Sequence, residues 1–315
     1  MNIIFFGSAN FSVPSLKAIL TGGHSISSVV TQPDRQKGRG LQIAETAVKK
    51  IAKDAGLNIY QPPRVNTDEV IKFLKSLSPD LFVVVAYGQI LSQEILDIPK
   101  VFSINAHASL LPKYRGAAPI NWAIINGDNK TGITIIKMID KMDAGPIISQ
   151  ETLDISEDDT SVTLEEKLSS LAAQLLLYAI KSIENKDYHL TAQDETKVSL
   201  APKLQKKDGQ INWEKSAQDI CNLIRGVLPW PGAFTYYNGK LLKIYRARVS
   251  SQVREFASSN PGEILEASKG GIVVFTGKGN IIIEELQIEG KKRMDVKEFI
   301  TGHKICVGEI LGTKK

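Results

Sequence analysis

The sequence predicts an α/β protein in two parts, a Rossmann-like N-terminal domain built on a parallel sheet and a small OB-like β-barrel. Three observations predict this fold class. Over residues 2–183, short apolar segments alternate with segments of helical periodicity, as in doubly wound sheets. One segment, residues 80–86, is almost continuously apolar, which is typical of a parallel strand buried on both faces. Beyond residue 232 the apolar segments are short and bounded by glycine, which favours a barrel.

The elements of the N-terminal part follow from apolar periodicity and helix-start signals. Pro14 and Pro119 can each open a helix, because proline suits the first helical turn. Thr67 can cap a helix, and Thr163 with Glu166 has the spacing of a capping box. The expected strands are 2–6, 25–31, 58–60, 80–86, 101–104, 132–139 and 146–155, and the expected helices start near Pro14 and cover 44–55, 68–77, 119–126 and 163–183.

A polar, lysine-rich stretch over residues 189–209 is interpreted as a linker. We therefore expect one domain of residues 1–202, with the linker from about 189, and a second of residues 208–315. In the second domain the expected elements are a helix over 216–225, a turn at 229–232, and strands over 233–237, 241–249, 271–275 and 280–287.

The composition excludes several classes of protein. Hydrophobic residues make up 43% and charged residues 23% of the 315 residues, which is ordinary for a globular protein, and no apolar run approaches the length of a membrane span. The first residues lack the basic start of a signal peptide, so we expect a cytoplasmic protein. The two cysteines, Cys221 and Cys306, are far apart and have no metal-ligand spacing, so no disulfide and no metal site is expected.

Positive charge is concentrated in the second part of the chain. Residues 203–315 hold 19 of the 39 Lys and Arg residues but only 12 of the 34 Asp and Glu residues. A cationic domain beside a nearly neutral one suggests a polyanionic partner such as nucleic acid. On charge alone, a solvated surface with excess lysine remains an alternative.

The first strand is followed by Gly-Ser-Ala-Asn-Phe-Ser from Gly7 to Ser12. This turn lacks the second and third glycines that let a backbone approach a pyrophosphate, so a dinucleotide cofactor is not expected.

The stretch from Ser103 to Trp122 carries the most chemical information. Asn105 and His107 lie two residues apart at the end of a predicted strand, so they project from one face at the carboxyl edge of the sheet, where such folds bind ligands. A structural histidine is the alternative, although the chain holds only four and the other three lie in polar contexts. Asp143 precedes a turn glycine, Gly145, and can equally be a turn-capping residue.

The segment 35–40 places three cations, Arg35, Lys37 and Arg39, within five residues, with Gly38 and Gly40 on both sides of Arg39. We expect a mobile loop that leaves the carboxyl end of the second strand and can reach the same edge of the sheet. An ordinary solvated connection is the alternative.

These segments together resemble the folate-dependent formyltransferases, and from end to end the branch that formylates methionyl-tRNA. The matching motifs are Val30-Thr-Gln-Pro-Asp34, Gly38-Arg-Gly40, Val83-Val-Val-Ala-Tyr-Gly88, Asn105-Ala-His107, Ser109-Leu-Leu-Pro112, Arg115-Gly-Ala-Ala-Pro-Ile120, Asp143-Ala-Gly145, Gln193-Asp-Glu-Thr196 and Pro229-Trp-Pro231. The chain departs from the family pattern at Val198-Ser199-Leu200, where Ala-Thr-Tyr is common, which leaves the linker contacts open.

The resemblance implies that residues 1–202 are a catalytic domain and residues 208–315 a tRNA-binding barrel. It implies transfer of a formyl group from 10-formyltetrahydrofolate to initiator methionyl-tRNA, by a monomer and without a metal. The implied catalytic residues are Asn105, His107 and Asp143. The residues implied to bind folate are Ser109, Leu110, Leu111 and Pro112, with backbone groups of Ala86, Tyr87, Gly88, Gln89 and Ile90 for the pterin. The expected tRNA contacts are Lys37, Arg39, Lys203, Lys206 and Lys207.

The chemistry of formyl transfer needs residues of these types. Attack of an amine on a formamide carbon puts negative charge on the formyl oxygen, to which Asn105 and His107 can donate hydrogen bonds. Asp143 can collect the amine proton directly or through a water. Three alternatives remain open: a formyltransferase for another amine, such as an amino-sugar nucleotide or glycinamide ribonucleotide, a hydrolase that releases formate, and a non-enzymatic tRNA-binding protein.

Overall fold

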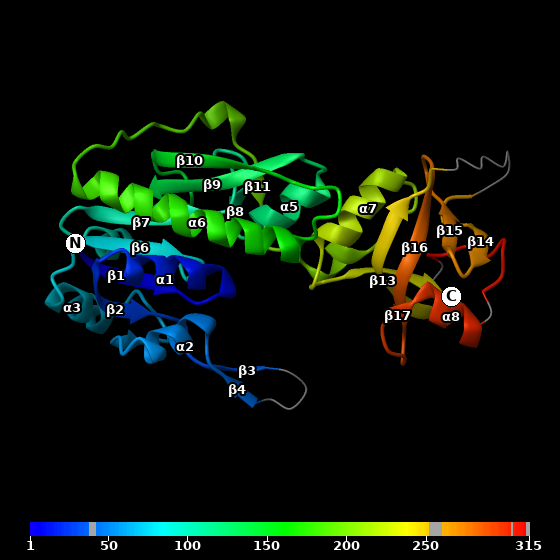
Figure 1. The fold of residues 1–315 in the computed structure, drawn as a ribbon, viewed down its shortest axis with the longest axis horizontal. Coiled ribbons are helices and arrows are strands. Elements are labelled where there is room, and N and C mark those ends of the chain that lie inside the picture. The colour runs from blue at the N-terminus through cyan, green and yellow to red at the C-terminus, as the bar shows by residue number, and fades with distance from the viewer. Residues whose placement is uncertain (38–41, 252–259, 304, 313–315) are drawn as a thin grey trace. The chain divides into compact units, whose positions relative to one another are not determined.

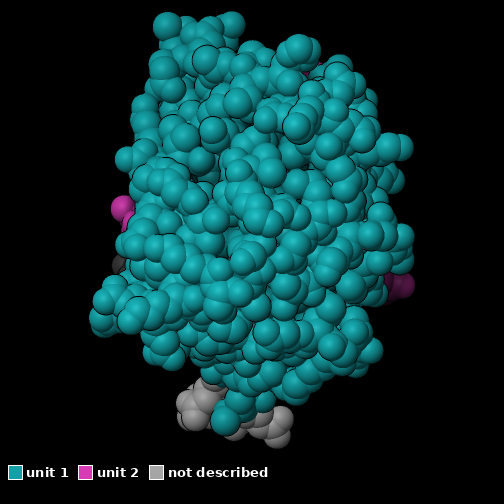
Figure 2. All heavy atoms as spheres, turned by 90° about the vertical axis from the view of Figure 1, so that its left-hand side faces the viewer, with its two compact units in different colours: residues 1–119, 130–154, 165–202 teal, residues 120–129, 155–164, 203–315 magenta. Residues whose placement is uncertain are grey.

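The structure is a computed structural model that describes residues 1–37, 42–251, 260–303 and 305–312. The chain divides into two compact units, which Figure 2 distinguishes by colour. Unit 1 comprises residues 1–119, 130–154 and 165–202, and unit 2 comprises residues 120–129, 155–164 and 203–315.

Unit 1 is built on a seven-stranded sheet in the order β10-β9-β7-β6-β1-β2-β5 (Figure 1). The strands from β7 to β5 run parallel, whereas β9 lies antiparallel to both β7 and β10. The predicted Rossmann-like fold class is therefore confirmed, with the correction that the sheet is mixed. The strands are β1 (Asn2–Gly7), β2 (Ser25–Val30), β5 (Ile59–Tyr60), β6 (Leu81–Val85), β7 (Phe102–His107), β9 (Lys130–Lys137) and β10 (Ile147–Asp154).

Among the helices in this half of the chain, α3 packs its apolar face against the sheet. Ile4 and Phe6 of β1 belong to a core cluster with Phe82 of β6 and with apolar residues of α3, including Leu74. Ile3 and Phe5 are also fully buried, and strand alternation directs them to the opposite face. The helices are η1 (Asn10–Ser12), α1 (Val13–Thr21), α2 (Ala47–Asp54), α3 (Asp68–Ser76), α4 (Gln93–Leu96), α5 (Pro119–Ile125) and α6 (Ser161–Glu184).

Of the two predicted helix caps, one is confirmed and the other is wrong. Thr67 caps α3 as predicted, since its side chain accepts a hydrogen bond from the Val70 N–H. The predicted capping box at Thr163 is wrong, because α6 begins at Ser161. The reciprocal bonds instead join Thr160 and Thr163: each hydroxyl accepts from the other's backbone N–H. A second threonine thus takes the place of the expected glutamate.

The two described ends of the segment after β2 are strands that pair with each other, whereas the sequence predicts a loop at residues 35–40. Strand β3 (Arg35–Lys37) pairs antiparallel with β4 (Gln42–Ala44). Gly38, Arg39 and Gly40 lie outside the described residues.

The predicted linker is also more structured than expected. Thr191 forms a bridge with Ile147, a 3-10 turn η2 covers Glu195–Lys197, and β11 (Leu200–Ala201) pairs in parallel with β8 (Arg115–Gly116). Residues 191–201 therefore form part of unit 1 and contact the loop after β7.

Unit 2 contains an antiparallel six-stranded sheet, consistent with the predicted β-rich C-terminal domain. Its main path is β12-β13-β16-β15-β14, and β17 pairs with β16. Helix α7 packs on this sheet, and its residues Ile220 and Ile224 join the same core cluster as Ile244 and Ile283. Sequence analysis missed β14, β17 and α8. The elements are η3 (Lys206–Gly209), α7 (Ala217–Gly226), β12 (Ala233–Tyr237), β13 (Lys240–Val249), β14 (Ile264–Ser268), β15 (Gly271–Phe275), β16 (Asn280–Ile288), β17 (Met294–Asp295) and α8 (Val296–Gly302).

Two segments from the middle of the chain are bound to α7 within unit 2. The Asn121 amide donates to the Gly226 carbonyl at 2.8 Å. Arg225 donates to the Asp159 carbonyl at 2.6 Å and to the Ser156 carbonyl at 3.2 Å. Residues 120–129 and 155–164 are therefore held to α7 by side-chain bonds to backbone carbonyls. Across the described ranges, no helix is both long and apolar enough to cross a membrane.

Candidate active site

Strand β7 delivers Asn105 and His107 to one face at its carboxyl end. The strand continues to His107, past the predicted end at Ile104, because Asn105 still pairs with Val84 of β6 and His107 with Thr134 of β9. Asn105 is partly buried and His107 is 6% exposed. The backbone that carries these two side chains is thus paired with β6 on one side and with β9 on the other, which fixes the distance between Asn105 and His107.

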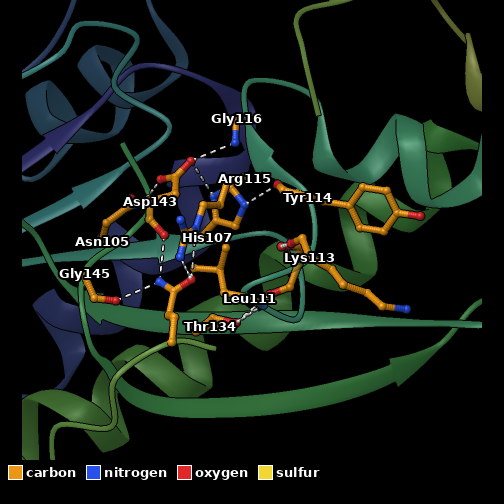
Figure 3. A network of polar contacts seen from close by, with 12 residues as sticks. Asn105, His107, Leu111, Lys113, Tyr114, Arg115, Gly116, Thr134, Asp143 and Gly145 are labelled. Atoms are coloured by element: carbon orange, nitrogen blue, oxygen red, sulfur yellow. Dashed lines mark hydrogen bonds and ion pairs between the residues drawn. The ribbon is translucent and has the colours of Figure 1, made fainter. Parts of the chain in front are cut away.

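The ring of His107 is oriented by the loop that follows β7. Its Nε2 lies 2.9 Å from the carbonyl oxygen of Tyr114, whose side chain points away from the ring (Figure 3). A carbonyl oxygen only accepts, so Nε2 carries a proton and donates. Nδ1 is therefore the ring nitrogen available for the rest of the site.

Asp143 belongs to the polar network drawn in Figure 3. Its Oδ2 accepts from the Gly116 N–H at 2.9 Å and is 3.6 Å from His107 Nδ1. Its Oδ1 is 3.5 Å from Asn105 Nδ2, which is long for a hydrogen bond and leaves the amide able to turn toward a substrate. The carboxylate thus contacts both other residues that the sequence singled out.

The backbone around Asp143 requires glycine nearby. Asp143 has φ of 50°, in the left-handed region that aspartate tolerates better than most residues. A Cβ on Gly145 would lie 1.8 Å from the Lys137 carbonyl oxygen, and one on Gly116 would lie 2.6 Å from the Ala201 carbonyl oxygen. Both glycines therefore allow backbone segments to approach closely enough to surround the carboxylate.

Sequence analysis missed three residues that lie behind Asp143. Gln193 donates to the carbonyl oxygens of Asp143 and Gly145, and its own oxygen accepts from Arg115. Arg115 in turn forms an ion pair with Glu195 at 2.7 Å. Hydrogen bonds from Arg115 and then Lys141 lower the pKa of Glu195 to about 2. The signals available in the sequence are the matching motifs at Arg115 to Ile120 and at Gln193 to Thr196, the second of which lies in the predicted linker.

The loop of Ser109, Leu110, Leu111 and Pro112 is fixed by one hydroxyl. Thr134 Oγ1 donates to the Ser109 carbonyl at 2.6 Å and accepts from the Leu111 N–H at 3.1 Å and from Gln150 Nε2 at 2.7 Å. Gln150 also donates to the Leu111 carbonyl at 3.0 Å. The loop therefore has a defined conformation beside His107.

Ser199 binds the backbone of the two residues that follow Lys113, just after this loop. Its Oγ accepts from the Tyr114 N–H, and its carbonyl accepts from the Arg115 N–H, both at 2.9 Å. The departure at Val198-Ser199-Leu200 therefore keeps a hydroxyl where the family commonly has threonine. Leu200, at the position of the common tyrosine, is 72% exposed.

The segment after β6 presents backbone at the same edge of the sheet. Ala86 and Gly88 are exposed and have positive φ, whereas the Tyr87 side chain is buried against Phe6 in the core. Burial raises the pKa of Tyr87. Gln89 accepts from the Val65 N–H at 2.9 Å, and the Ile90 carbonyl accepts from Asn66 at 3.0 Å. Tyr87 can therefore serve a ligand here only through its backbone.

Three of the basic residues expected to contact tRNA lie in the other unit. Lys203, Lys206 and Lys207 are exposed in unit 2, the last two within η3. The backbone of Lys37 lies in β3, and Arg39 lies outside the described residues. Within the ranges that the structure describes, no group of three or more His, Cys, Asp and Glu side chains is arranged to hold a metal ion.

Comparison with known proteins assigns the chain to a family. Residues 1–180 match the family described as Formyl transferase, and residues 203–304 match its C-terminal domain. The chain belongs to the formyl transferase family, a family of formyl-transferring enzymes.

Two curated relatives extend this similarity over the whole chain. The methionyl-tRNA formyltransferase of Acetivibrio thermocellus is 44% identical over 312 residues, covering 99% of this chain and 100% of the relative. That of Geotalea uraniireducens is 43% identical over 314 residues, covering 100% and 99%.

Solved structures show the same fold at lower sequence identity. The sugar 3N-formyl transferase WlaRD, crystallised with dTDP and 5-N-formyl-THF, has a TM-score of 0.68 at 21% identity, covering 93% of this chain and 99% of that chain. HypX from Aquifex aeolicus, in complex with tetrahydrofolic acid, has a TM-score of 0.63 at 17% identity, covering 96% and 47%.

Proposed function

We propose that this chain transfers the formyl group of 10-formyltetrahydrofolate to the amino group of initiator methionyl-tRNA. The observation that carries the proposal is the convergence of Asn105, His107 and Asp143 in a chain that matches methionyl-tRNA formyltransferases along its full length. The solved structures with bound folates lend support to a folate as the donor.

The first step is attack of the methionyl amine on the formyl carbon, which forms a C–N bond and an oxyanion. Asn105 Nδ2 donates to this oxygen, and His107 donates through Nδ1 when that nitrogen carries a proton, because Nε2 is already engaged with the Tyr114 carbonyl. These donors are held by β7 before the substrate arrives, so little reorganisation accompanies the reaction.

The second step moves a proton and releases the donor. The attacking nitrogen becomes cationic, and Asp143 accepts its proton directly or through one water. The oxyanion then re-forms the carbonyl as the bond between the formyl carbon and N10 of the folate breaks, and N10 takes up the proton that Asp143 accepted as tetrahydrofolate leaves. No covalent intermediate with the enzyme is required.

The donor is proposed to bind between two ordered backbone segments. The loop of Ser109, Leu110, Leu111 and Pro112 lines its pocket, and the pterin hydrogen-bonds to backbone groups of residues 86–90. The exposed backbone of Ala86 and Gly88 and the bonds that fix Gln89 and Ile90 are consistent with this role.

The domain roles are part of the same proposal. Residues 1–202 carry the chemistry, and residues 208–315 supply a cationic surface for tRNA, with Lys37, Arg39, Lys203, Lys206 and Lys207 as contacts. The enzyme is proposed to act as a monomer in the cytoplasm, without a metal.

One assay tests the function against its alternatives. The protein is incubated with 10-formyltetrahydrofolate and with methionyl-tRNA, an amino-sugar nucleotide, glycinamide ribonucleotide or buffer, and formylated products and free formate are measured. Formyl-methionyl-tRNA as the dominant product supports the proposal. Formylation of another amine, or formate release at the same rate without an acceptor, would overturn it.

A further inference from the structure

A hydrogen-bonded chain of side chains leads from the segment 193–195 to Asp143. Gln193 Nε2 donates to the carbonyl oxygens of Asp143 and Gly145, each at 2.7 Å. A side-chain amide has two N–H donors, so both donors of Gln193 bind the turn that contains Asp143. The two bonds therefore clamp the backbone on either side of Ala144.

Arg115 fixes which way the Gln193 amide points. Its Nε and Nη2 donate to Gln193 Oε1 at 3.1 and 2.8 Å. A guanidinium only donates, so the amide atom beside it must be the oxygen, and the nitrogen must face the Asp143 turn. The orientation of Gln193 thus follows from the chemistry of its neighbour.

Glu195 completes the chain by balancing the charge of Arg115. Arg115 is 5% exposed, and its two Nη atoms donate to the two carboxylate oxygens of Glu195 at 2.7 and 3.4 Å. Lys141, two residues before Asp143, also donates to Glu195 at 3.1 Å. Glu195 therefore binds to the turn segment both directly and through Arg115 and Gln193.

The turn needs this support because its backbone is in an uncommon conformation. Asp143 has φ of 50°, a left-handed conformation that is uncommon for non-glycine residues, although aspartate tolerates it better than most. If the two bonds from Gln193 are lost, the turn can relax, and the carboxylate can leave the Gly116 N–H and His107 Nδ1.

We propose that Gln193, held by Arg115 and Glu195, is the positioning residue for the Asp143 carboxylate. The catalytic consequence rests on the proposed function, in which Asp143 accepts the amine proton. The geometric part concerns the Asp143 turn alone and is measurable without any substrate.

The activity test uses Gln193→Glu, which keeps the shape of the side chain and its bonds from Arg115 but cannot donate to the two carbonyls. We expect kcat for formyl transfer to fall about tenfold or more, with KM for both substrates changed less than about twofold. The matched control is Gln174→Glu on the exposed side of α6, which should leave both constants unchanged. If Gln193 acts through Asp143, adding Gln193→Glu to Asp143→Asn should lower kcat by less than about twofold, whereas losses that multiply would overturn the proposal.

The second readout is the exchange rate of the Gly116 amide proton, which donates to Asp143 Oδ2 at 2.9 Å. We expect exchange to be about tenfold faster in Gln193→Glu and unchanged in Gln174→Glu. Gln193→Met, which has neither donor nor acceptor, should give the same acceleration if Gln193→Glu does not fold. Unchanged Gly116 exchange in a folded variant overturns the proposal. If the wild-type protein makes no formyl-methionyl-tRNA, the proposed function fails, and this exchange measurement alone decides the role of Gln193.

Discussion

The carboxylate of Asp143 depends on residues that come from three separate places in the chain. Asn105 and His107 lie on β7, Gly116 on β8, and Gln193 beyond α6. Only the first pair is close in sequence. Single residues in this site therefore take their roles from contacts that the fold creates.

Glu195 gives a prediction about pH. Its pKa is lowered to about 2 in the folded protein, while the pKa of an unfolded glutamate is about 4.3. The folded state therefore binds fewer protons between these values, so the stabilisation is present above the unfolded pKa and is lost as pH falls toward about 2. We expect Glu195→Gln to lower the free energy of unfolding at pH 7, and the difference from wild type to shrink between about pH 5 and pH 2. Urea unfolding at several pH values measures this difference.

The control for this experiment is Glu151→Gln on β10, where the side chain is exposed. A difference between wild type and Glu195→Gln that stays constant from pH 7 to the acid range would contradict the assigned ion pair.

At the scale of single residues, the sequence predicts the site residues whose spacing follows the alternation of a strand. Asn105 and His107 could be paired because alternation along a strand puts residues two apart on one face. Asp143 was assigned by the company of these two and by family resemblance, since a turn carboxylate alone has a structural explanation. Gln193, Arg115 and Glu195 could not be assigned, because their contacts join positions 78 and 80 residues apart.

At the scale of elements, the predictions failed where polar residues replace apolar ones. The end of β7 was placed at Ile104 because the apolar run stops there, yet the strand continues through the polar residues of the site. Strand β14 was missed because Glu266 and Ser268 interrupt its apolar pattern. Segment 189–209 reads as a linker because it is polar, yet its residues 193–199 bind polar groups of the site loops.

Ser199 gives a prediction for that segment. Ser199→Ala removes the acceptor of the Tyr114 N–H, so we expect a loss of about 1 kcal/mol of stability. The Tyr114 carbonyl holds His107, so formyl transfer should also slow. Ser199→Thr keeps the hydroxyl and is the matched control. Thermal unfolding and kcat are measured for both variants, and equal effects of alanine and threonine would show that the hydroxyl does not matter.

At the scale of the whole molecule, the excess of positive charge and the candidate active site lie in different parts of the sequence. The positive charge is concentrated in residues 203–315, whereas the polar network around Asp143 belongs to unit 1. The two-part fold class was predictable, since periodicity changes along the chain. The grouping of residues 120–129 and 155–164 with unit 2 had no signal in the sequence, because it depends on side chains such as Arg225 reaching distant carbonyls.

Counterion release gives a prediction about tRNA binding. Affinity of the full chain for methionyl-tRNA should fall linearly with salt on logarithmic axes. Replacing Lys203, Lys206 and Lys207 together by glutamine should reduce that slope by up to about 3. The matched control replaces three exposed lysines of unit 1, Lys17, Lys50 and Lys72. Binding that does not depend on salt, or equal effects of the two triple variants, would contradict the assigned surface.

The most direct test of the central claim is the turnover of formyl transfer to methionyl-tRNA in three variants of the full chain. We predict that Asn105→Ala, His107→Ala and Asp143→Ala each lower kcat by about 10²- to 10³-fold or more, since each removes a group that we propose contacts the reacting atoms. Their melting temperatures should allow folded protein at the assay temperature, and their affinity for tRNA should match that of the wild type. A His107→Ala variant that forms formyl-methionyl-tRNA at a near wild-type rate would contradict the account.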